Sequence, residues 1–507
     1  MQNKTGKVYL IGAGPGDPGL ITVKGKECIQ SADVVVYDYL ASKTLLNYAR
    51  SDAQIIYVGK KGGDHTLTQD KINDLIVEKA KNGLTVARLK GGDPFIFGRG
   101  GEEAEELLDA GCSFEIVPGV TSAIAAPAYA GIPLTHRRFT SSVSIITGHE
   151  DPTKKDSNLN WEILAQMEGT LVFLMGVKNL GNIATKLVEN GKDAETPVAL
   201  VRWGTTTKQR SVTGTLSNIV DVVEKAKIKS PSIIIVGGVV TLKDTLKWFE
   251  DRPLFGKKII VTRAREQASD LVKLLTDSGA ECIECPTIKV VDPDDKKPLD
   301  DAISNLETYE WLIFTSVNGV KYFFDRLFEN GLDVRALGNL KTATIGPATS
   351  QKLLDYGIKS DVIPKTYRAE AVVEAFENID VKGKKILLPR ALEARSVLPE
   401  ELTKMGAELD DVASYQTVTV HENKDLLLSE LESGNVDMVT FTSSSTVKNF
   451  KGMIPEERFD ELINGLKVAS IGPITSDTAR DLNFEIATEA EAFTIPGLTD
   501  AILKFYS

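Results

Sequence analysis

The sequence predicts an α/β protein with several sheets of largely parallel strands. Short apolar runs rich in β-branched residues alternate with helical patterns along the chain. Glycine- and proline-rich loops directly follow several of these runs, and the second half of the chain repeats itself. At 507 residues, with 42% hydrophobic and 26% charged residues, the chain is long enough for roughly two to four domains with separate cores.

The first half contains eight runs that predict strands. They are VYLIG (8–12), DVVVYD (33–38), LTVARLK (84–90), FEIVPG (114–119), SVSIITG (142–148), GTLVFLMG (169–176), PVALVRW (197–203) and SIIIVGG (232–238). The segment EEAEELLDAG (102–111) predicts a helix between two of them. DRPLFGKK (251–258) combines proline, glycine and charge before a new strand, so it predicts the main domain boundary.

The second half contains a diverged duplication. KKIIVTR at 257 recurs as KKILLPR at 384, GAE at 279 recurs at 406, and FTS at 314 recurs at 441, each 127 residues later. IGPATS at 345 recurs as IGPITS at 471. These matches predict two similar α/β units with a ligand cleft between them. The threonine and serine of each IGP-x-T-S segment can cap a following helix or present hydroxyl groups to an anion.

Composition narrows the class of protein. A net charge of −12 provides no basic field for nucleic acid, and no apolar run is long enough to span a bilayer. Cys282 and Cys285 form a C-x-x-C pattern, which predicts either a redox or zinc pair or two reduced cysteines on opposite faces of a strand, the interpretation we favour. We expect no metal site and a cytoplasmic protein.

The loop IGAGPGDPG (11–19) raises two alternatives. Gly14, Gly16 and Gly19 satisfy the G-x-G-x-x-G pattern of a dinucleotide site, and Asp38 closes the second strand where a ribose-binding acid would lie. Pro15 and Pro18 argue against it, because each removes an N–H group from a loop that would bind pyrophosphate through such groups. A stiff loop with few donors suits a ligand without phosphate.

Six motifs, in this order, resemble the uroporphyrinogen-III C-methyltransferase family over residues 5–250. They are GAGPGDPGLITVKG, VVVYDYL, YVGKKGG, RLKGGDPFIFGRGGEE, VPGVTSAIAAPAYAGIPLTHR and TLVFLMG. The resemblance implies a two-lobed tetrapyrrole-methylase fold that binds S-adenosyl-L-methionine and releases S-adenosyl-L-homocysteine. The residues that it implies around this cofactor are Pro15, Gly91, Gly92, Asp93, Ile96, Thr121, Ser122, Met175 and Gly204.

The same resemblance implies Asp38 as a catalytic base and Lys60 as an acid. The structural alternatives are a strand-end cap for Asp38 and a surface charge for Lys60. Arg88, Lys90, Arg99, Arg137 and Arg138 are candidates to bind the carboxylates of the substrate.

Residues 257–507 resemble uroporphyrinogen-III synthases through TSVNGV (315–320), PKTYRAEAV (364–372), ASYQTV (413–418) and both IGP-x-T-S segments. The resemblance implies two similar parallel-sheet α/β subdomains, 258–291 plus 417–507 and 292–416, after a linker at 251–257 and a methyltransferase domain at 1–250. It implies Tyr415 as a catalytic residue, unless this tyrosine merely packs at the crossover between subdomains. Hydroxyl groups for substrate binding would come from Thr315, Ser316, Thr349, Ser443, Ser444 and Thr475.

These resemblances together imply a bifunctional enzyme. Its second half would cyclise hydroxymethylbilane to uroporphyrinogen III, and its first half would methylate that product twice to precorrin-2 for sirohaem or cobalamin synthesis. The family also implies a homodimer through the methyltransferase half. Two alternatives stay open: an NAD-dependent dehydrogenase in the first half, and a non-catalytic ligand-sensing module in the second.

Overall fold

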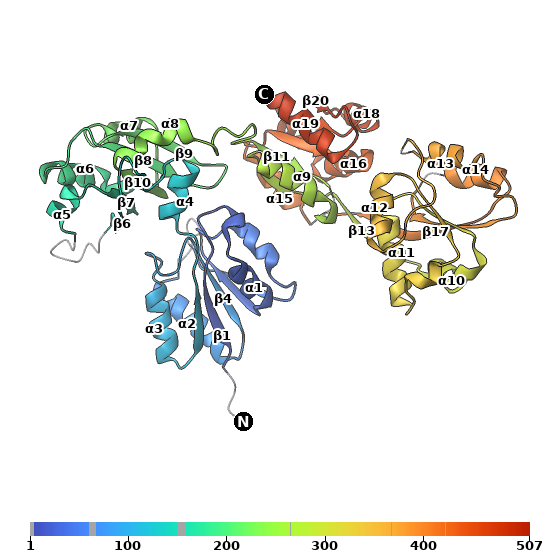
Figure 1. The fold of residues 1–507 in the computed structure, drawn as a ribbon, viewed down its shortest axis with the longest axis horizontal. Coiled ribbons are helices and arrows are strands. Elements are labelled where there is room, and N and C mark those ends of the chain that lie inside the picture. Colours follow the sequence, from blue (N-terminus) through green and yellow to red (C-terminus); the bar gives the residue numbers. More distant parts are fainter. Residues whose placement is uncertain are drawn as a thin grey trace. The chain divides into compact units, whose positions relative to one another are not determined.

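The computed structural model describes residues 5–59, 67–149, 159–263, 265–366, 368–394, 396–420 and 422–507, with the backbone alone for 265–269. The chain forms two compact units (Figure 1). The first extends to Lys257 and includes Asp277–Glu281; the second contains Lys258–Thr276 and Cys282–Ser507. No helix among the described residues is long and apolar enough to cross a membrane.

The first sheet has five strands, all parallel, in the order β3-β2-β4-β1-β5. The strands are β1 (Lys7–Gly12), β2 (Val34–Tyr37), β3 (Gln54–Tyr57), β4 (Val86–Lys90) and β5 (Ser113–Val117). Helices α2 (Gln69–Lys81) and α3 (Gly100–Asp109) cover one face, where Ile76 and Leu107 are buried, and α1 (Val23–Ser31) covers the other. Burial on both faces explains why these strands are continuous apolar runs.

The second sheet of the first unit is mixed, with the order β6-β7-β10-β8-β9. Its strands are β6 (Val143–Thr147), β7 (Thr170–Leu174), β8 (Pro197–Arg202), β9 (Arg210–Thr215) and β10 (Ser232–Val236). Only β6 and β7 pair in parallel; β10 is antiparallel to β7 and β8, and β8 is antiparallel to β9. The expectation of largely parallel sheets is confirmed for the first sheet and wrong for this one.

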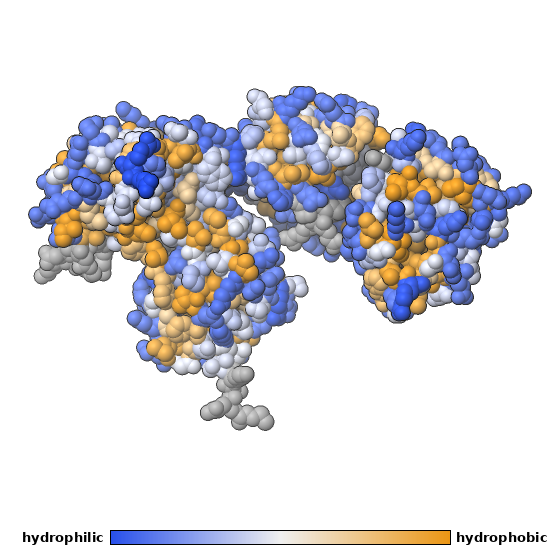
Figure 2. Space-filling view, in the orientation of Figure 1, coloured by the Kyte–Doolittle hydropathy of each residue, from blue (hydrophilic) through white to orange (hydrophobic). Residues whose placement is uncertain are grey.

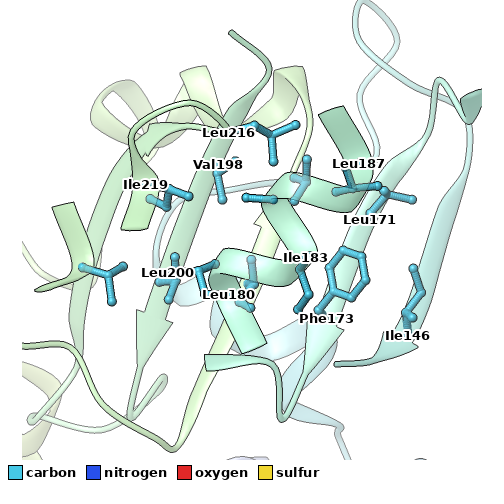
Figure 3. Packing of buried hydrophobic residues seen from close by; sticks show 14 of the residues in the cluster. Ile146, Leu171, Phe173, Leu180, Ile183, Leu187, Val198, Leu200, Leu216 and Ile219 are labelled. Atoms are coloured by element: carbon cyan, nitrogen blue, oxygen red, sulfur yellow. The ribbon is translucent and has the colours of Figure 1, made fainter. Parts of the chain in front are cut away.

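One face of the second sheet packs against α6 (Leu180–Glu189). Leu180, Ile183 and Leu187, at helical spacing, lie against Leu171 and Phe173 of β7 (Figure 3). The other face packs against α4 (Ser122–Tyr129), which contributes Ala123 and Ala126. The short helices α5 (Trp161–Gln166), α7 (Ile219–Lys225) and α8 (Lys243–Leu246) complete this half of the unit.

All eight runs that predict strands in the first half form strands, and α3 lies where a helix was expected. Two strands, β3 and β9, were not predicted. Gln54 and Ile55 of β3 are exposed, and β9 has the polar sequence RSVTGT, because both strands lie at sheet edges where one side faces water. Neither therefore has the apolar run that signals a buried strand.

The second unit contains two further sheets, ordered β12-β11-β18-β19-β20 and β13-β17-β16-β14-β15. The strands of the first are β11 (Lys258–Val261), β12 (Glu281–Glu284), β18 (Met438–Phe441), β19 (Lys467–Ser470) and β20 (Ile486–Glu489). Those of the second are β13 (Ile288–Val291), β14 (Trp311–Phe314), β15 (Lys341–Thr344), β16 (Lys385–Ala391) and β17 (Glu408–Thr419).

Helices connect these strands throughout the second unit. They are α9 (Arg265–Asp277), α10 (Lys297–Ser304), α11 (Val317–Glu329), α12 (Pro347–Asp355), α13 (Ala369–Phe376), α14 (Val397–Lys404), α15 (Lys424–Glu432), α16 (Ser444–Met453), α17 (Phe459–Ile463), α18 (Pro473–Asp481) and α19 (Ile495–Tyr506).

Hydrophilic residues predominate on the visible surface of each unit, with hydrophobic residues gathered in separate patches (Figure 2).

The duplication is visible in the strand orders. The repeated sequences pair β11 with β16, β12 with β17, β18 with β14 and β19 with β15. Under this pairing, the order β12-β11-β18-β19 matches β17-β16-β14-β15 strand for strand. Of its four matched strands, each sheet takes two from one repeat and two from the other, so a sequence repeat does not correspond to a folded sheet.

The chain passes between these two sheets through β13 and the end of β17. Ile288–Val291 pairs antiparallel with Gln416–Thr419. The subdomain boundaries that the sequence suggested, 291/292 and 416/417, fall in this pair of crossing strands.

Candidate active sites

Three loops that follow strands of the first sheet pack backbone to backbone. Gly14 and Gly92 exchange two hydrogen bonds, of 3.2 and 2.7 Å between backbone N and O. A Cβ atom on Gly12 would lie 2.4 Å from the Cα of Gly119, and one on Gly119 would lie 2.4 Å from the carbonyl oxygen of Gly92. Only glycine permits this approach, which explains the glycines after β1, β4 and β5.

Asp93 joins two of these loops through its side chain. One carboxylate oxygen accepts hydrogen bonds from the backbone N–H groups of Phe95 and Ile96, at 2.8 and 3.1 Å. The other accepts from Gly119 N–H at 3.0 Å. Both oxygens of Asp93 are therefore used to shape the loops.

These loops form one wall of a cavity of about 590 Å³ in the first unit. The opposite wall comes from the ends of β7, β8 and β10. All nine residues predicted to surround the cofactor line this cavity: Pro15, Gly91, Gly92, Asp93, Ile96, Thr121, Ser122, Met175 and Gly204. Their role in binding stays a prediction, but the fold brings them to one place from five separate segments.

The remaining lining is mostly apolar. Five lining residues were not among the predicted site residues, although three of them lie within the family motifs: Leu40, Phe97, Leu174, Trp203 and Ile233. His149 and Lys178 also line the cavity and add basic groups. His149 follows the strand run SIITG, and its position after a strand was the only available signal.

Left-handed backbone conformations cluster around the cavity. Among the described non-glycine residues with positive φ, Phe97, Met175 and Trp203 line the cavity, with φ of 53°, 58° and 48°. Arg99 and Thr205, with φ of 57° and 71°, lie within two residues of lining residues. Such conformations are costly for side chains with a Cβ and gather at functional sites.

The glycine loop has little capacity to bind phosphate. Pro15 and Pro18 have no N–H group. The N–H group of Gly14 donates to the carbonyl oxygen of Gly92, and that of Asp17 donates to the Thr205 hydroxyl. The N–H group of Gly19 donates to the Asp17 carboxylate. A dinucleotide site needs free N–H groups here. The dehydrogenase alternative therefore finds no support at the loop that suggested it.

Asp38 lies one residue before Tyr39–Ser42, which line the cavity. Its carboxylate accepts a hydrogen bond from Leu40 N–H at 3.1 Å and lies 3.2 Å from the guanidinium of Arg88. The carboxylate is 27% exposed, so a small molecule can reach it. Lys60, the predicted acid, lies outside the described residues.

Arg88 and Lys90 are buried, at 2% and 4% exposure, and their charges face a buried carboxylate. One oxygen of Glu103 lies 2.6 Å from Lys90 Nζ and 3.3 Å from Arg88 Nε and accepts from Gln69 Nε2 at 3.0 Å. Burial, and then the nearby charge of Arg88, lower the pKa of Lys90. Neither basic residue lines the cavity, so their charges act on Glu103 and Asp38.

The other basic candidates are on the surface. Arg99 is paired with Glu102 at 2.5 Å, and Arg137 and Arg138 are exposed. None of the three is among the residues that line the cavity.

In the second unit, Tyr415 lies at an irregularity of the sheet. The pairing of β16 and β17 shifts register between Arg390 and Ala391, and Ala391 lies opposite Tyr415. A bulge of this kind redirects a side chain. The Tyr415 hydroxyl lies 3.0 Å from the Ser316 hydroxyl, and the ring lies 5.7 Å from that of Tyr322. Burial raises the pKa of Tyr415, so its hydroxyl stays protonated.

The predicted hydroxyl residues of this unit fall into three groups. Ser316 and Ser443 are N-caps of α11 and α16, and Ser443 forms a capping box with Thr446. Thr349 and Thr475 are buried, at 3% and 5% exposure. Thr315 is half-buried, and Ser444 donates to the carbonyl of Ile474 at 3.3 Å.

The capping interpretation of the IGP-x-T-S segments is wrong. Gly346 and Gly472 are the N-cap residues of α12 and α18, and proline occupies the first helical position. Because proline is well suited to that position, each helix starts two residues before the threonine, which leaves the threonine and serine inside the first turn.

None of the four cysteines forms a disulfide. Cys285 is buried, and burial raises its pKa to about 12, whereas Cys282 is half-buried. Among the described residues, no group of histidine, cysteine and acidic side chains has an arrangement that could hold a metal ion.

Two family models match the chain. The model described as Tetrapyrrole (Corrin/Porphyrin) Methylases matches residues 7–220, and the model described as Uroporphyrinogen-III synthase HemD matches residues 269–500. The fold and the two sites thus define a class: a tetrapyrrole methylase followed by a uroporphyrinogen-III synthase.

Relatives match both the whole chain and its first unit. The porphyrin biosynthesis protein HemD of Ruminiclostridium josui is 39% identical over 98% of each chain. A uroporphyrinogen-III C-methyltransferase of Bacillus subtilis is 47% identical over 69% of this chain and 70% of its own. An S-adenosyl-L-methionine-dependent uroporphyrinogen III methyltransferase of Methanosarcina barkeri is 56% identical over 48% of this chain and 96% of its own. The chain belongs to this family of tetrapyrrole biosynthesis proteins, with a uroporphyrinogen-III C-methyltransferase unit and a uroporphyrinogen-III synthase unit.

Proposed function

We propose that this chain catalyses two consecutive steps of tetrapyrrole biosynthesis. The second unit closes hydroxymethylbilane to uroporphyrinogen III, with inversion of one pyrrole ring and loss of water. The first unit transfers two methyl groups from S-adenosyl-L-methionine to that product and yields precorrin-2, the precursor of sirohaem and cobalamin. The observation that carries the first assignment is the single cavity lined by all nine predicted cofactor residues.

The residues of this cavity fit a sulfonium compound. Its walls include Leu40, Ile96, Leu174 and Val201, which suit a methylated sulfur and an adenine ring. The neighbouring glycine loop has committed the N–H groups of Gly14, Asp17 and Gly19 to protein partners, so it is poorly suited to a phosphate. A cation without phosphate needs apolar surface and oxygen acceptors, and these loops supply both.

When bound, S-adenosyl-L-methionine supplies an electrophilic methyl group for in-line transfer to a carbon of the substrate. The cavity residues contribute by holding the reactants in the right geometry, which lowers the activation barrier of a transfer between two bound molecules. Asp38, half-exposed beside the cavity and oriented by Arg88, accepts the proton that the methylated carbon loses. Buried Arg88 contacts this carboxylate directly, and Lys90 pairs with Glu103, which also contacts Arg88.

In the second unit, the neutral hydroxyl of Tyr415 donates a proton to the hydroxyl group that leaves hydroxymethylbilane. Its partner Ser316 holds it in place at 3.0 Å. Hydroxyl and backbone N–H groups of the FTS and IGP-x-T-S loops bind the acetate and propionate side chains. Many weak contacts of this type would fold the linear substrate before ring closure.

We also propose the division of the chain into a methyltransferase domain (1–250), a linker (251–257) and a synthase (258–507) with subdomains 258–291 plus 417–507 and 292–416. The resemblance to the methyltransferase family supports a homodimer formed through the first domain. Four cysteines that form no disulfide suit a reducing compartment, so we place the protein in the cytoplasm.

Product analysis by mass spectrometry tests both activities. Supplied with hydroxymethylbilane alone, the full chain should yield uroporphyrinogen III; with S-adenosyl-L-methionine added, it should yield the dimethylated product. A calorimetric titration should show binding of S-adenosyl-L-homocysteine and none of NAD. A folded chain that leaves hydroxymethylbilane to close spontaneously to the type I isomer would identify the second unit as a ligand sensor, and tight NAD binding would overturn the first assignment.

A further inference from the structure

A closed ring of hydrogen bonds joins the glycine loop to the end of α4 and to the segment between β8 and β9. Tyr129 Oη donates to Asp17 Oδ2 at 2.7 Å, and Asp17 N–H donates to Thr205 Oγ1 at 3.0 Å. Thr205 N–H donates to Gln209 Oε1 at 2.9 Å, and Gln209 Nε2 donates to the carbonyl oxygen of Tyr129 at 3.1 Å. We call these four residues the Asp17 ring.

The Asp17 ring is sheltered from water. Thr205 and Gln209 are each 3% exposed, and Asp17 and Tyr129 are half-buried. Burial, and then the hydrogen bond to Asp17, raise the pKa of Tyr129, so the phenol remains a proton donor to a carboxylate. A hydrogen bond to a charged acceptor away from water is among the stronger ones that a protein forms.

The ring is anchored further by Glu250. Gln209 Nε2 also donates to Glu250 Oε1 at 2.9 Å, and Ser211 Oγ donates to the same oxygen at 2.7 Å. Lys243 Nζ lies 3.7 Å from the other oxygen of Glu250. These contacts fix the amide of Gln209, whose oxygen holds Thr205 in its left-handed conformation with φ of 71°.

No member of the Asp17 ring lines the cavity. Residues next to Asp17 and Thr205 in the sequence do line it. Pro15 and Gly16 precede Asp17, and Trp203, Gly204 and Thr206 flank Thr205. A Cβ on Gly16 would lie 2.6 Å from Cγ2 of Thr206, so the two loops are in direct contact. The ring therefore closes at the point where the two walls of the cavity meet.

We propose that the Asp17 ring sets the separation of these two walls and thereby the affinity for the methyl donor, with Asp17, Tyr129, Thr205 and Gln209 as positioning residues. This inference rests on the proposed function of the first unit. Because Pro15 and Pro18 stiffen the loop, an error in its position cannot be absorbed locally and moves the whole wall. Cofactor affinity should then depend on bonds that never touch the cofactor.

Two substitutions that break one bond each test the ring. Tyr129→Phe removes the donor to Asp17, and Thr205→Val removes the acceptor for Asp17 N–H. We expect either substitution to raise the dissociation constant of S-adenosyl-L-homocysteine, measured by calorimetry, by about five-fold to ten-fold, the net scale of one ordinary protein hydrogen bond. The Michaelis constant for the methyl donor should rise in parallel, while kcat and the Michaelis constant for the tetrapyrrole stay within about two-fold.

A variant that carries both Tyr129→Phe and Thr205→Val tests whether the hydrogen bonds act as one connected ring or as independent contacts. Once the ring is open, a second break has little left to disrupt, so the double variant should bind no more than about two-fold more weakly than the weaker-binding single variant. Tyr48→Phe, a tyrosine whose ring lies under Lys26 Nζ, is the matched control and should bind as the unmodified chain does.

Each outcome supports or overturns the inference. The inference would be overturned if folded Tyr129→Phe bound S-adenosyl-L-homocysteine as tightly as the unmodified chain does. It would also be overturned if the increase in the dissociation constant of the double variant equalled the product of the two single increases. If Tyr129→Phe does not fold, as judged by its thermal transition, Thr205→Val carries the test alone. If the unmodified chain binds no S-adenosyl-L-homocysteine, the proposed function fails instead.

Discussion

At the scale of single residues, the two proposed catalytic groups differ in how the protein holds them. Asp38 is partly exposed and is oriented by a cation, Arg88, that is itself anchored on buried Glu103. Tyr415 is 8% exposed and is oriented by a neutral hydroxyl. A carboxylate with a fixed cation suits proton uptake, and a neutral phenol suits proton donation.

Asp38→Asn should reduce methylation by about 100-fold or more, the usual contribution of a general base, because the amide cannot accept the proton. Cyclisation of hydroxymethylbilane should be unchanged. Rates of both reactions, measured on one preparation of the full chain, check this expectation. Asp52→Asn, which changes an exposed carboxylate paired with Arg50, is the control. Equal loss of both activities would point to misfolding.

Tyr415→Phe should slow only cyclisation, and by about ten-fold or less, because folding of the substrate by many contacts would supply most of the effect. The measurement is the rate of uroporphyrinogen III formation, with methylation of supplied uroporphyrinogen III as the internal reference. Tyr356→Phe, at a ring stacked on Phe324, serves for comparison. An unaltered cyclisation rate would remove Tyr415 from the mechanism.

At the scale of elements, β1 determines the position of the glycine loop. It is an interior strand of its sheet, between β4 and the edge strand β5. At the opposite end from the loop, Lys7 of β1 lies 2.6 Å from Glu115 of β5, and Lys24 of α1 pairs with the same carboxylate. One acidic side chain thus connects two strands and a helix.

Glu115 gives the first unit a pH-dependent contribution to stability. Hydrogen bonds from Lys24 and then Lys7 lower its pKa from 4.5 to about 2. A lowered pKa in the folded state means that the contribution is complete above pH 4.5 and is lost as the pH falls toward 2. In urea denaturation at about pH 5 and about pH 3, Glu115→Gln should lose less stability than the unmodified chain over this interval.

The control for this prediction is Glu105→Gln, at an exposed position of α3. It should follow the unmodified chain at both pH values. If Glu115→Gln shows the same loss of stability on acidification as the unmodified chain, the two lysines do not stabilise the folded state through this carboxylate.

At the scale of the whole molecule, each unit has cores of its own. The two sheets of the first unit are covered by helices that bury Leu107 and Ile183, among others, and those of the second by helices that bury Phe323 and Phe450. A ligand that binds one unit stabilises that unit by mass action.

Calorimetric unfolding of the full chain should therefore show two transitions. S-adenosyl-L-homocysteine at 100 times its dissociation constant should stabilise the first unit by about 2.7 kcal/mol and raise only one of the transition temperatures. A chain with Asp38→Asn should respond in the same way, because Asp38 does not line the cavity. A single transition that moves as a whole would mean that the two units unfold cooperatively.

Local sequence was sufficient for the buried strands, for the glycine loops and for the duplication. A buried strand must be apolar, and a loop whose backbone touches another backbone must contain glycine, so both leave a signal within a few residues. The edge strands β3 and β9 left none, because an edge strand that faces water tolerates polar residues.

The sequence by itself determined the α/β class and the family, and the family resemblance predicted nine residues that line one cavity of the first unit, since motifs of fixed spacing encode them. Only the tertiary structure decided that Arg88 and Lys90 face a buried carboxylate, that each synthase sheet combines strands of both repeats, and that Asp17 closes a ring with Tyr129. The physical reason is distance along the chain: Asp17 and Tyr129 are separated by 112 residues, and a hydrogen bond between such residues depends on packing that no local pattern records.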